Sequence, residues 1–196
     1  MVRKNEKIPA FLYALGALED RSFELYSSLS KMVKSPRASA LLLYIASDSL
    51  KHAMLMKTIG GDNTKLNLND KECEKVIGDA WKTLQKTSKE ISKVKTIDED
   101  NLLPIIDNLM RVYAFSLIQF KTLQFMAEQI SELYGLDLRD IREILELTVR
   151  DEEIDTEILS KLKGLSSKEV EPEAQTSPIV RYQTPDRWIS PGYANF

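Results

Sequence analysis

Apolar residues along most of this chain recur at intervals of three and four, the spacing that places side chains on one face of an α-helix. The pattern predicts a first helix from about Ile8 to about Val33, where Ser35-Pro36 interrupts it. Ser35 is then expected to cap a second helix that begins at Pro36 and ends at Gly60. Because the connection is short, the two helices are expected to be antiparallel.

A third helix is predicted to follow Asn69, because Asn69 and Glu72 have the spacing of a capping box. Its apolar stripe is narrow, it continues to about Val94, and its other face is rich in lysine. This pattern favours one continuous helix that lies on the surface of a bundle and returns the chain from one end to the other.

Two further helices complete the predicted bundle. The fourth has Pro104 near its first turn and ends at Gly135, and the fifth begins at Asp137 and ends at Gly164. Their connection is again short, which predicts a second antiparallel hairpin. The sequence therefore indicates an all-α domain over residues 1–165.

Residues 166–196 show neither a helical nor an alternating period, and four of the seven prolines fall there. We expect an irregular tail. Its aromatic residues suggest that the segment 177–196 docks on its own bundle, on a second copy of the chain or on another protein; they are Tyr182, Trp188, Tyr193 and Phe196.

The two predicted hairpins resemble each other in sequence. Segment 45–56 matches segment 148–159 at an offset of 103, which pairs the only histidine, His52, with Asp155. The preceding helices match at an offset of 100, which pairs Glu19 with Gln119 and Tyr26 with Met126. These constant offsets suggest an internal duplication.

Two antiparallel hairpins joined by a long crossover form the ferritin-like type of four-helix bundle. Segments 17–19, 46–52 and 151–155, together with Tyr26, resemble rubrerythrin-type di-iron carboxylate proteins of the ferritin-like superfamily. That family carries Glu on its first and third bundle helices and Glu-x-x-His on its second and fourth. The resemblance covers roughly residues 8–60 and 100–163, and it implies a ferritin-like antiparallel four-helix bundle with a helical crossover.

Carried over position by position, the resemblance implies four metal ligands, which are Glu19, His52, Glu152 and Asp155. Three family ligands are replaced in this chain. Gln119 occupies the position of a terminal carboxylate, Ser49 that of a bridging glutamate and Asp155 that of the second histidine. One nitrogen and several oxygens suit a single Fe, Mn or Zn ion better than a complete di-iron centre. The implied activity is residual oxidation of Fe²⁺ by oxygen or peroxide.

Several alternatives stay open at the level of sequence. The same polar residues can form a hydrogen-bonded cluster without a metal, because buried charges need partners in either case. A shift by one turn would bring in Asp48, Asp151 or Glu153 instead. The bundle can also be a non-catalytic scaffold whose tail docks on a partner.

Composition narrows the classes of function. The net charge of −3 and the lack of a basic stripe argue against nucleic acid as a ligand. No glycine-rich phosphate loop implies a nucleotide or flavin, and no apolar run approaches the ~20 residues that span a membrane. The lone Cys73 excludes an intrachain disulfide, and the apolar run 8–18 continues as an amphipathic helix rather than a signal peptide. We therefore expect a cytoplasmic protein. The resemblance to ferritin-like proteins, which commonly self-associate through helix faces, implies a homo-oligomer.

Overall fold

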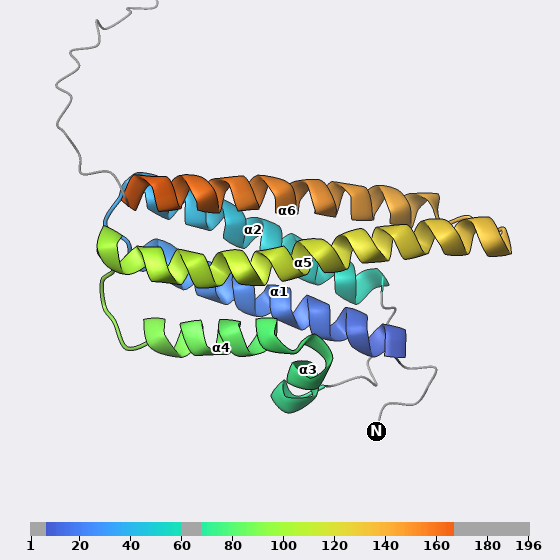
Figure 1. The fold of residues 1–196 in the computed structure, drawn as a ribbon, viewed down its shortest axis with the longest axis horizontal. Coiled ribbons are helices and arrows are strands. Elements are labelled where there is room, and N and C mark those ends of the chain that lie inside the picture. Colours follow the sequence, from blue (N-terminus) through green and yellow to red (C-terminus); the bar gives the residue numbers. More distant parts are fainter. Residues whose placement is uncertain (1–6, 60–67, 167–196) are drawn as a thin grey trace, which may run out of the picture.

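The computed structural model describes residues 7–59 and 68–166, and within them the chain is built from α-helices (Figure 1). This confirms the predicted all-α class. The predicted tail, including segment 177–196, lies outside the described residues. The helices are α1 (Lys7–Met32), α2 (Pro36–Ile59), α3 (Asp70–Ile77), α4 (Asp79–Ile91), α5 (Glu99–Tyr134) and α6 (Arg139–Ser166).

The four long helices begin and end close to the predicted positions. Ser35 caps α2, since its Oγ accepts a hydrogen bond from the backbone N–H of Ala38 at 3.3 Å. Gly135 ends α5 with φ of 64°, a left-handed conformation that glycine adopts without steric cost. These local signals stop each helix where the apolar period also stops.

The crossover between the hairpins differs from the prediction, because one continuous helix is replaced by α3 and α4. Asn69 forms the expected capping box with Glu72 at the start of α3. The break is at Gly78, whose φ of 76° and ψ of −131° are accessible to glycine and strained for other residues. The apolar period runs across this position, so periodicity alone did not reveal the break.

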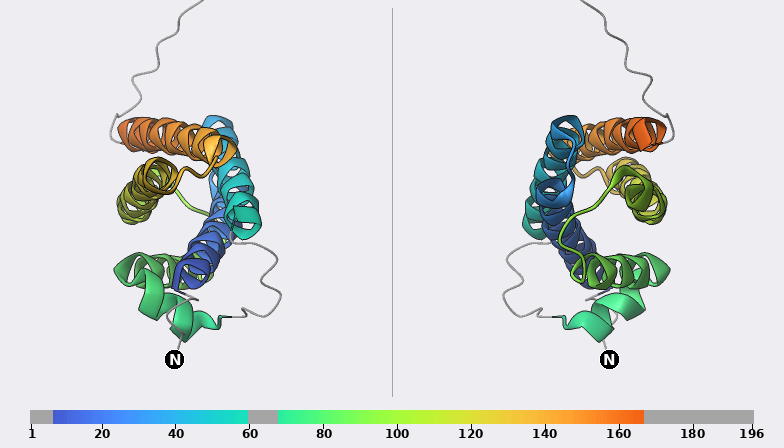
Figure 2. Two further views of the ribbon diagram at one scale, coloured as in Figure 1. Left: turned by 90° about the vertical axis from the view of Figure 1, so that its right-hand side faces the viewer. Right: turned by 90° about the vertical axis from the view of Figure 1, so that its left-hand side faces the viewer.

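The helices pack side by side in the order α4, α1, α2, α6, α5, and α5 returns to contact α4 (Figure 2). Helix α4 lies against both α1 and α5 and buries Trp81, Leu84 and Ile91, while its lysines face outward. The narrow stripe predicted for this helix is therefore confirmed. The closed arrangement encloses a core formed by side chains of every long helix.

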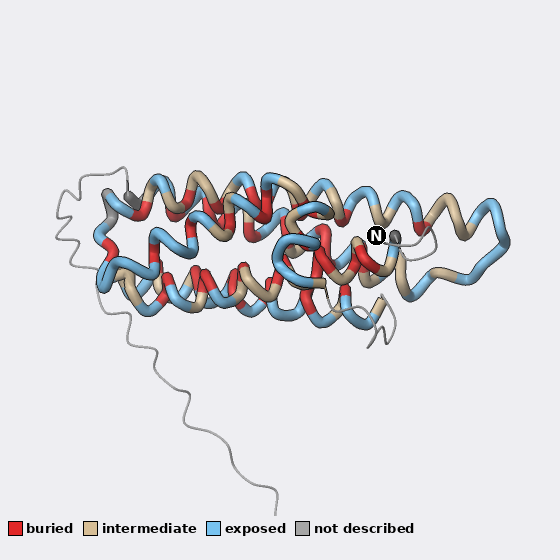
Figure 3. Tube along the Cα trace, turned by 90° about the horizontal axis from the view of Figure 1, so that it is seen from below, coloured by how far each residue is buried: buried red, intermediate tan, exposed pale blue. Residues whose placement is uncertain are grey.

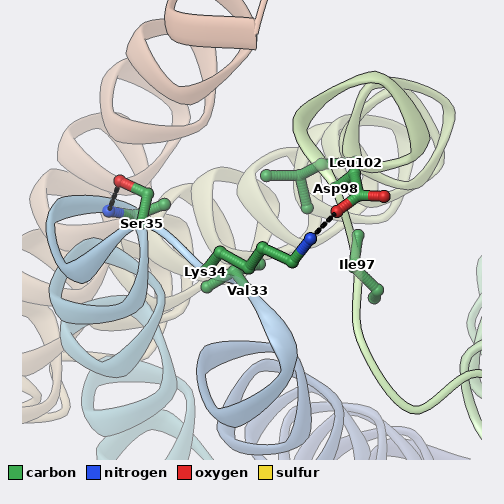
Figure 4. Close-up of a pocket in the computed structure, with 7 residues that line it drawn as sticks. Val33, Lys34, Ser35, Ile97, Asp98 and Leu102 are labelled. Atoms are coloured by element: carbon green, nitrogen blue, oxygen red, sulfur yellow. Dashed lines mark hydrogen bonds and ion pairs between the residues drawn. The ribbon is translucent and has the colours of Figure 1, made fainter.

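The α5–α6 hairpin extends beyond the α1–α2 hairpin at one end (Figure 1). Residues near the α5–α6 connection are exposed or half-buried, and Leu133 is 76% exposed (Figure 3). At the opposite end of the molecule, the residues that follow α1 are bonded to the residues that precede α5. There the backbone N–H of Ile97 donates a hydrogen bond to the carbonyl of Met32 at 3.0 Å. A pocket lies beside this bond, and Lys34 and Asp98, which line it, form an ion pair at 2.7 Å (Figure 4).

In the described ranges, 7–59 and 68–166, we find no helix with the length and apolarity that crossing a bilayer requires.

Candidate metal centre

Midway along the bundle, the apolar core gives way to a cluster of polar side chains contributed by α1, α2, α5 and α6. Each of them is at most 2% exposed. Most belong to i, i+3 pairs, a spacing that places two side chains on one helix face. The cluster consists of Glu19, Ser49, His52, Tyr113, Ser116, Glu152 and Asp155.

Three of these residues meet closely enough to share one metal ion. Glu19, His52 and Glu152 each offer a ligand atom, and these atoms lie within 4.8 Å of one another. The Nδ1 atom of His52 is 3.1 Å from Oε1 of Glu152. One imidazole nitrogen and two carboxylates, brought together by α1, α2 and α6, are therefore directed at a common point.

Asp155, the fourth residue implied as a ligand, is buried beside this group but is not part of it. Its Oδ2 accepts a hydrogen bond from the hydroxyl of Tyr113 at 3.0 Å. The same hydroxyl is 3.2 Å from the hydroxyl of Ser49. Asp155 is therefore bonded to Tyr113 and does not belong to the group of three candidate ligands.

Helix α5 meets the cluster with residues that the sequence comparison did not select. Ser116 donates a hydrogen bond to Oε1 of Glu19 at 2.8 Å, and Tyr113 lies edge-on to Tyr26. Gln119, the position paired with Glu19 by the offset of 100, is only half-buried. The sequence feature that could have identified Tyr113 and Ser116 is their position as polar residues on an otherwise apolar helix face.

On the side nearest the solvent, the cluster contacts charged side chains that are partly exposed. Nε2 of His52 is 3.4 Å from Oδ2 of Asp151. Lys51 places its Nζ 2.6 Å from that same oxygen and 2.6 Å from Oδ1 of Asp48. Two of the alternative acids, Asp48 and Asp151, therefore lie next to the centre, whereas Glu153 pairs with Lys121 on the surface.

Two polar atoms of the cluster and one of the adjacent Tyr26 are buried without a hydrogen-bond partner among the described residues. They are Oε2 of Glu152, Oδ1 of Asp155 and the hydroxyl of Tyr26. An unsatisfied buried polar atom costs about 1–3 kcal/mol. Because these atoms lie close together, one additional polar group or ion bound among them could satisfy them.

Burial dominates the acid–base properties of the carboxyl groups. It raises the pKa of Glu19 to about 7, although the hydrogen bond from Ser116 opposes the change. It raises the pKa of Asp155 to about 8, and the negative charge of Asp48 adds to the effect. The pKa of Glu152 rises well above its usual value because of burial and then repulsion by Glu19. Without a cation, these acids are therefore protonated to a much larger extent near pH 7 than exposed carboxyl groups are.

Burial also lowers the pKa of His52, and the hydrogen bond to Asp151 only partly opposes this change. The imidazole is consequently neutral at pH 7, the form that binds metal ions. Because the acids are partly protonated and the imidazole is neutral, the metal-free cluster carries less charge than its residue types suggest. A divalent cation would displace carboxyl protons, so binding and proton release are expected to be coupled.

Comparison with known proteins gives no match: no protein-family model, no curated protein and no solved structure is significantly similar to this chain.

Proposed function

We propose that this protein binds one divalent transition-metal ion through Glu19, His52 and Glu152. The observation that carries the proposal is the convergence of three fully buried ligand atoms within 4.8 Å of one another. Buried ionisable groups are costly unless they are paired or bound to a cation. A divalent ion would satisfy the two carboxylates together and would also offer a partner to Oε2 of Glu152.

The donor types favour Fe²⁺, Mn²⁺ or Zn²⁺, because imidazole with carboxylates suits these ions and no thiolate is present in the group. Three protein ligands leave coordination positions for water or a small oxidant. With iron bound, the reaction proposed is slow oxidation of Fe²⁺, in which the metal loses one electron to oxygen or peroxide. The protein residues hold the ion and exclude bulk water.

A relationship to rubrerythrin-type ferritin-like proteins is part of the same proposal. It is supported by the resemblance in sequence and by ligands that come from α1, α2 and α6 rather than from one loop. The departure from that family lies on α5, which contributes the hydroxyls of Tyr113 and Ser116. A cytoplasmic location and a homo-oligomeric state remain predictions from the sequence.

The proposal is tested with protein purified without a histidine tag and stripped with a chelator. Titration with Fe²⁺, Mn²⁺ and Zn²⁺ is expected to give one tightly bound ion per chain and a rise in the melting temperature. His52→Ala and Glu152→Gln should abolish that binding because each removes a converging ligand. Glu153→Gln is the matched control, since Glu153 is the adjacent glutamate and its exposed side chain pairs with Lys121.

Circular dichroism checks that each variant keeps its helical content. The proposal is wrong if the wild-type protein binds less than a stoichiometric amount of every ion, which would identify the cluster as a metal-free polar core. It is also wrong if Glu153→Gln lowers affinity as much as Glu152→Gln does. Ferrous oxidation by the loaded wild-type protein, absent in His52→Ala, tests the redox part separately.

A further inference from the structure

Helix α2 carries apolar side chains on two opposite faces. The inner face packs in the core, where Leu42, Ile45 and Met56 are fully buried. On the outer face, Leu50 is 37% exposed and Met54 is 62% exposed. Helices α1 and α6 flank α2, and the described part of the chain leaves its outer face open to solvent (Figure 2). Burial in the core therefore accounts for only one of the two apolar faces.

The outer apolar residues follow the spacing of a coiled-coil seam. Alternating steps of three and four residues, which average 3.5, keep one narrow stripe directed at a partner helix. No residue of this stripe is charged, although the solvent-facing side of a helix is ordinarily charged or polar. We call these exposed residues the α2 seam; they are Ala40, Leu43, Ser47, Leu50 and Met54. This is the pattern of a helix that packs on both sides.

A groove on the α2 seam has the form that a partner helix requires. In a coiled coil, each seam side chain of one helix inserts into a hole between four residues of the other, spaced i, i+3, i+4 and i+7. Residues 47, 50, 51 and 54 have this spacing, and so do residues 51, 54, 55 and 58. The groove is lined by these residues, which are Ser47, Leu50, Lys51, Met54, Leu55 and Thr58. It therefore combines two successive holes of a coiled coil.

A second copy of α2 in the antiparallel orientation is complementary to the seam. In one register Ser47 lies opposite Leu50 of the second copy, whose side chain enters the hole beside the small hydroxyl. The same register places Leu43 opposite Met54, because both pairs of residue numbers add up to 97. A two-fold axis, the commonest symmetry of homodimers, repeats each contact. A parallel pair would instead place Ser47 on Ser47 and leave the hole beside it unfilled.

Helix α6 extends the apolar surface beside the seam. Nζ of Lys51 is 2.6 Å from Oδ2 of Asp151, so this face of α6 lies alongside α2. Leu147 and Ile154 are four residues before and three residues after Asp151, on the same helix face, and they are 61% and 37% exposed. Tyr44 of α2, 49% exposed, adds an aromatic ring.

The area of this surface matches the requirement of a stable dimer. The large apolar residues of the seam, with Tyr44, Leu147 and Ile154, expose on the order of 550 Å² per copy, at about 200 Å² for a fully exposed residue. A standard interface takes about 800 Å² from each partner, and slightly more than half of that area is apolar. The surface therefore supplies the apolar part of such an interface.

We propose that two copies of this chain form an antiparallel, two-fold dimer through the α2 seam, in which Leu50 of each copy inserts beside Ser47 of the other. The inference does not rest on the proposed metal binding, because the seam is exposed on one face of α2 and His52 is buried on the other. Association and metal content are therefore measured independently.

Sedimentation velocity of the full-length protein over a range of concentrations measures the dimer. The wild type should sediment as a dimer. Leu50→Glu should raise the dissociation constant about 100-fold or more, because it places two carboxylates at the centre of the interface. The control is Leu133→Glu, which puts the same charge on an exposed leucine of α5 away from the seam and should leave the dimer intact. Circular dichroism checks that both variants keep their helical content.

Ser47→Leu distinguishes the proposed packing from unspecific association of apolar surfaces. Leucine at this exposed position makes the seam more apolar, but it fills the hole that receives Leu50 of the second copy. The dimer should therefore weaken about tenfold or more through overpacking. An unspecific apolar patch would associate more tightly in this variant, and that result would overturn the proposed register.

A distance between spin labels measures the orientation. Arg37→Cys in a Cys73→Ser background carries one nitroxide at the exposed start of α2. In the proposed register the two labelled positions are about 23 residues apart along the helix axis, or roughly 35 Å, whereas a parallel pair would bring them to about 10–20 Å. The shorter distance would overturn the antiparallel arrangement. The proposal itself is wrong if the wild type stays monomeric at every concentration, if Leu50→Glu remains a dimer, or if Leu133→Glu dissociates equally.

Discussion

The α1–α2 and α5–α6 hairpins have similar segments in sequence, yet they supply different chemistry to the shared centre. The first contributes Glu19 and His52, one ligand from each helix. The second contributes its acids from α6 alone, and α5 provides the hydroxyls of Tyr113 and Ser116. Similarity in sequence therefore did not produce two equivalent halves of a site.

The reason lies in how each helix is oriented. The offset of 103 correctly brings His52 and Asp155 to the same cluster, because α2 and α6 pack against each other. The offset of 100 does not predict which residues of α5 enter the centre. Gln119 is half-buried and Met126 is 40% exposed, whereas their counterparts Glu19 and Tyr26 are buried. Helix α5 buries Tyr113, Ser116 and Phe120, so the face that it turns inward is not the face that carries Gln119 and Met126.

The hairpins also differ in how closely they are packed. A Cβ atom placed on Gly16 would lie 3.2 Å from the carbonyl oxygen of Ala53, so α1 and α2 approach tightly near the centre. The end of the α5–α6 hairpin instead projects past the other helices (Figure 1). Stability should consequently depend much more on the first hairpin than on this projecting end.

The largest difference is expected for matched leucine substitutions in the two hairpins. Leu18→Ala removes a side chain of α1 that is fully buried, which should lower the free energy of unfolding by about 3–5 kcal/mol. Leu133→Ala alters a 76% exposed side chain of α5 and should change it by less than about 0.5 kcal/mol. Urea denaturation of both variants measures the difference. Equal losses would show that the projecting end is covered in solution.

A second effect concerns the acids that each hairpin places in the centre. The folded pKa values, about 7 for Glu19 and about 8 for Asp155, lie above the ordinary values of 4.5 and 3.8. The folded state thus binds more protons than the unfolded state between about pH 4 and pH 8. The metal-free protein should therefore lose stability as pH rises through this window.

One pKa unit corresponds to ~1.4 kcal/mol, and local relaxation reduces the full sum, so we expect a loss on the order of 2–3 kcal/mol between pH 5 and pH 8. Denaturation of chelator-treated protein at several pH values measures it. Asp155→Asn should flatten the slope more than Glu19→Gln, because the pKa of Asp155 is displaced further. A slope that is unchanged in both variants, or stability that increases with pH, would contradict this assignment.

The smallest effect distinguishes Tyr26 and Tyr113, two buried tyrosines of different hairpins whose rings meet edge to face. Tyr113→Phe removes a hydroxyl that contacts both Asp155 and Ser49, which should cost about 1–2 kcal/mol. Tyr26→Phe removes a hydroxyl without a partner among the described residues, so its stability should stay the same or rise slightly. Thermal unfolding of the metal-free variants gives the comparison. A larger loss in Tyr26→Phe would indicate that its hydroxyl is bonded in solution.

The sequence by itself determined the long helices and several of their ends. Helical period, Ser35 before Pro36, the capping box of Asn69 and the glycine at position 135 are local features, and each acts through the backbone beside it. The resemblance to the ferritin-like family selected Glu19, His52, Glu152 and Asp155 position by position, and the first three of them converge in the structure.

Only the tertiary structure decided which side chains complete the centre. Tyr113 and Ser116 enter the centre because of the face that α5 turns toward the core. Asp151, an alternative ligand in the sequence, lies beside His52 at the outer edge of the centre. The break at Gly78 was likewise hidden, since an apolar period can cross a glycine without showing its φ. Contacts between residues 42–100 positions apart depend on how whole helices dock, which no local pattern encodes.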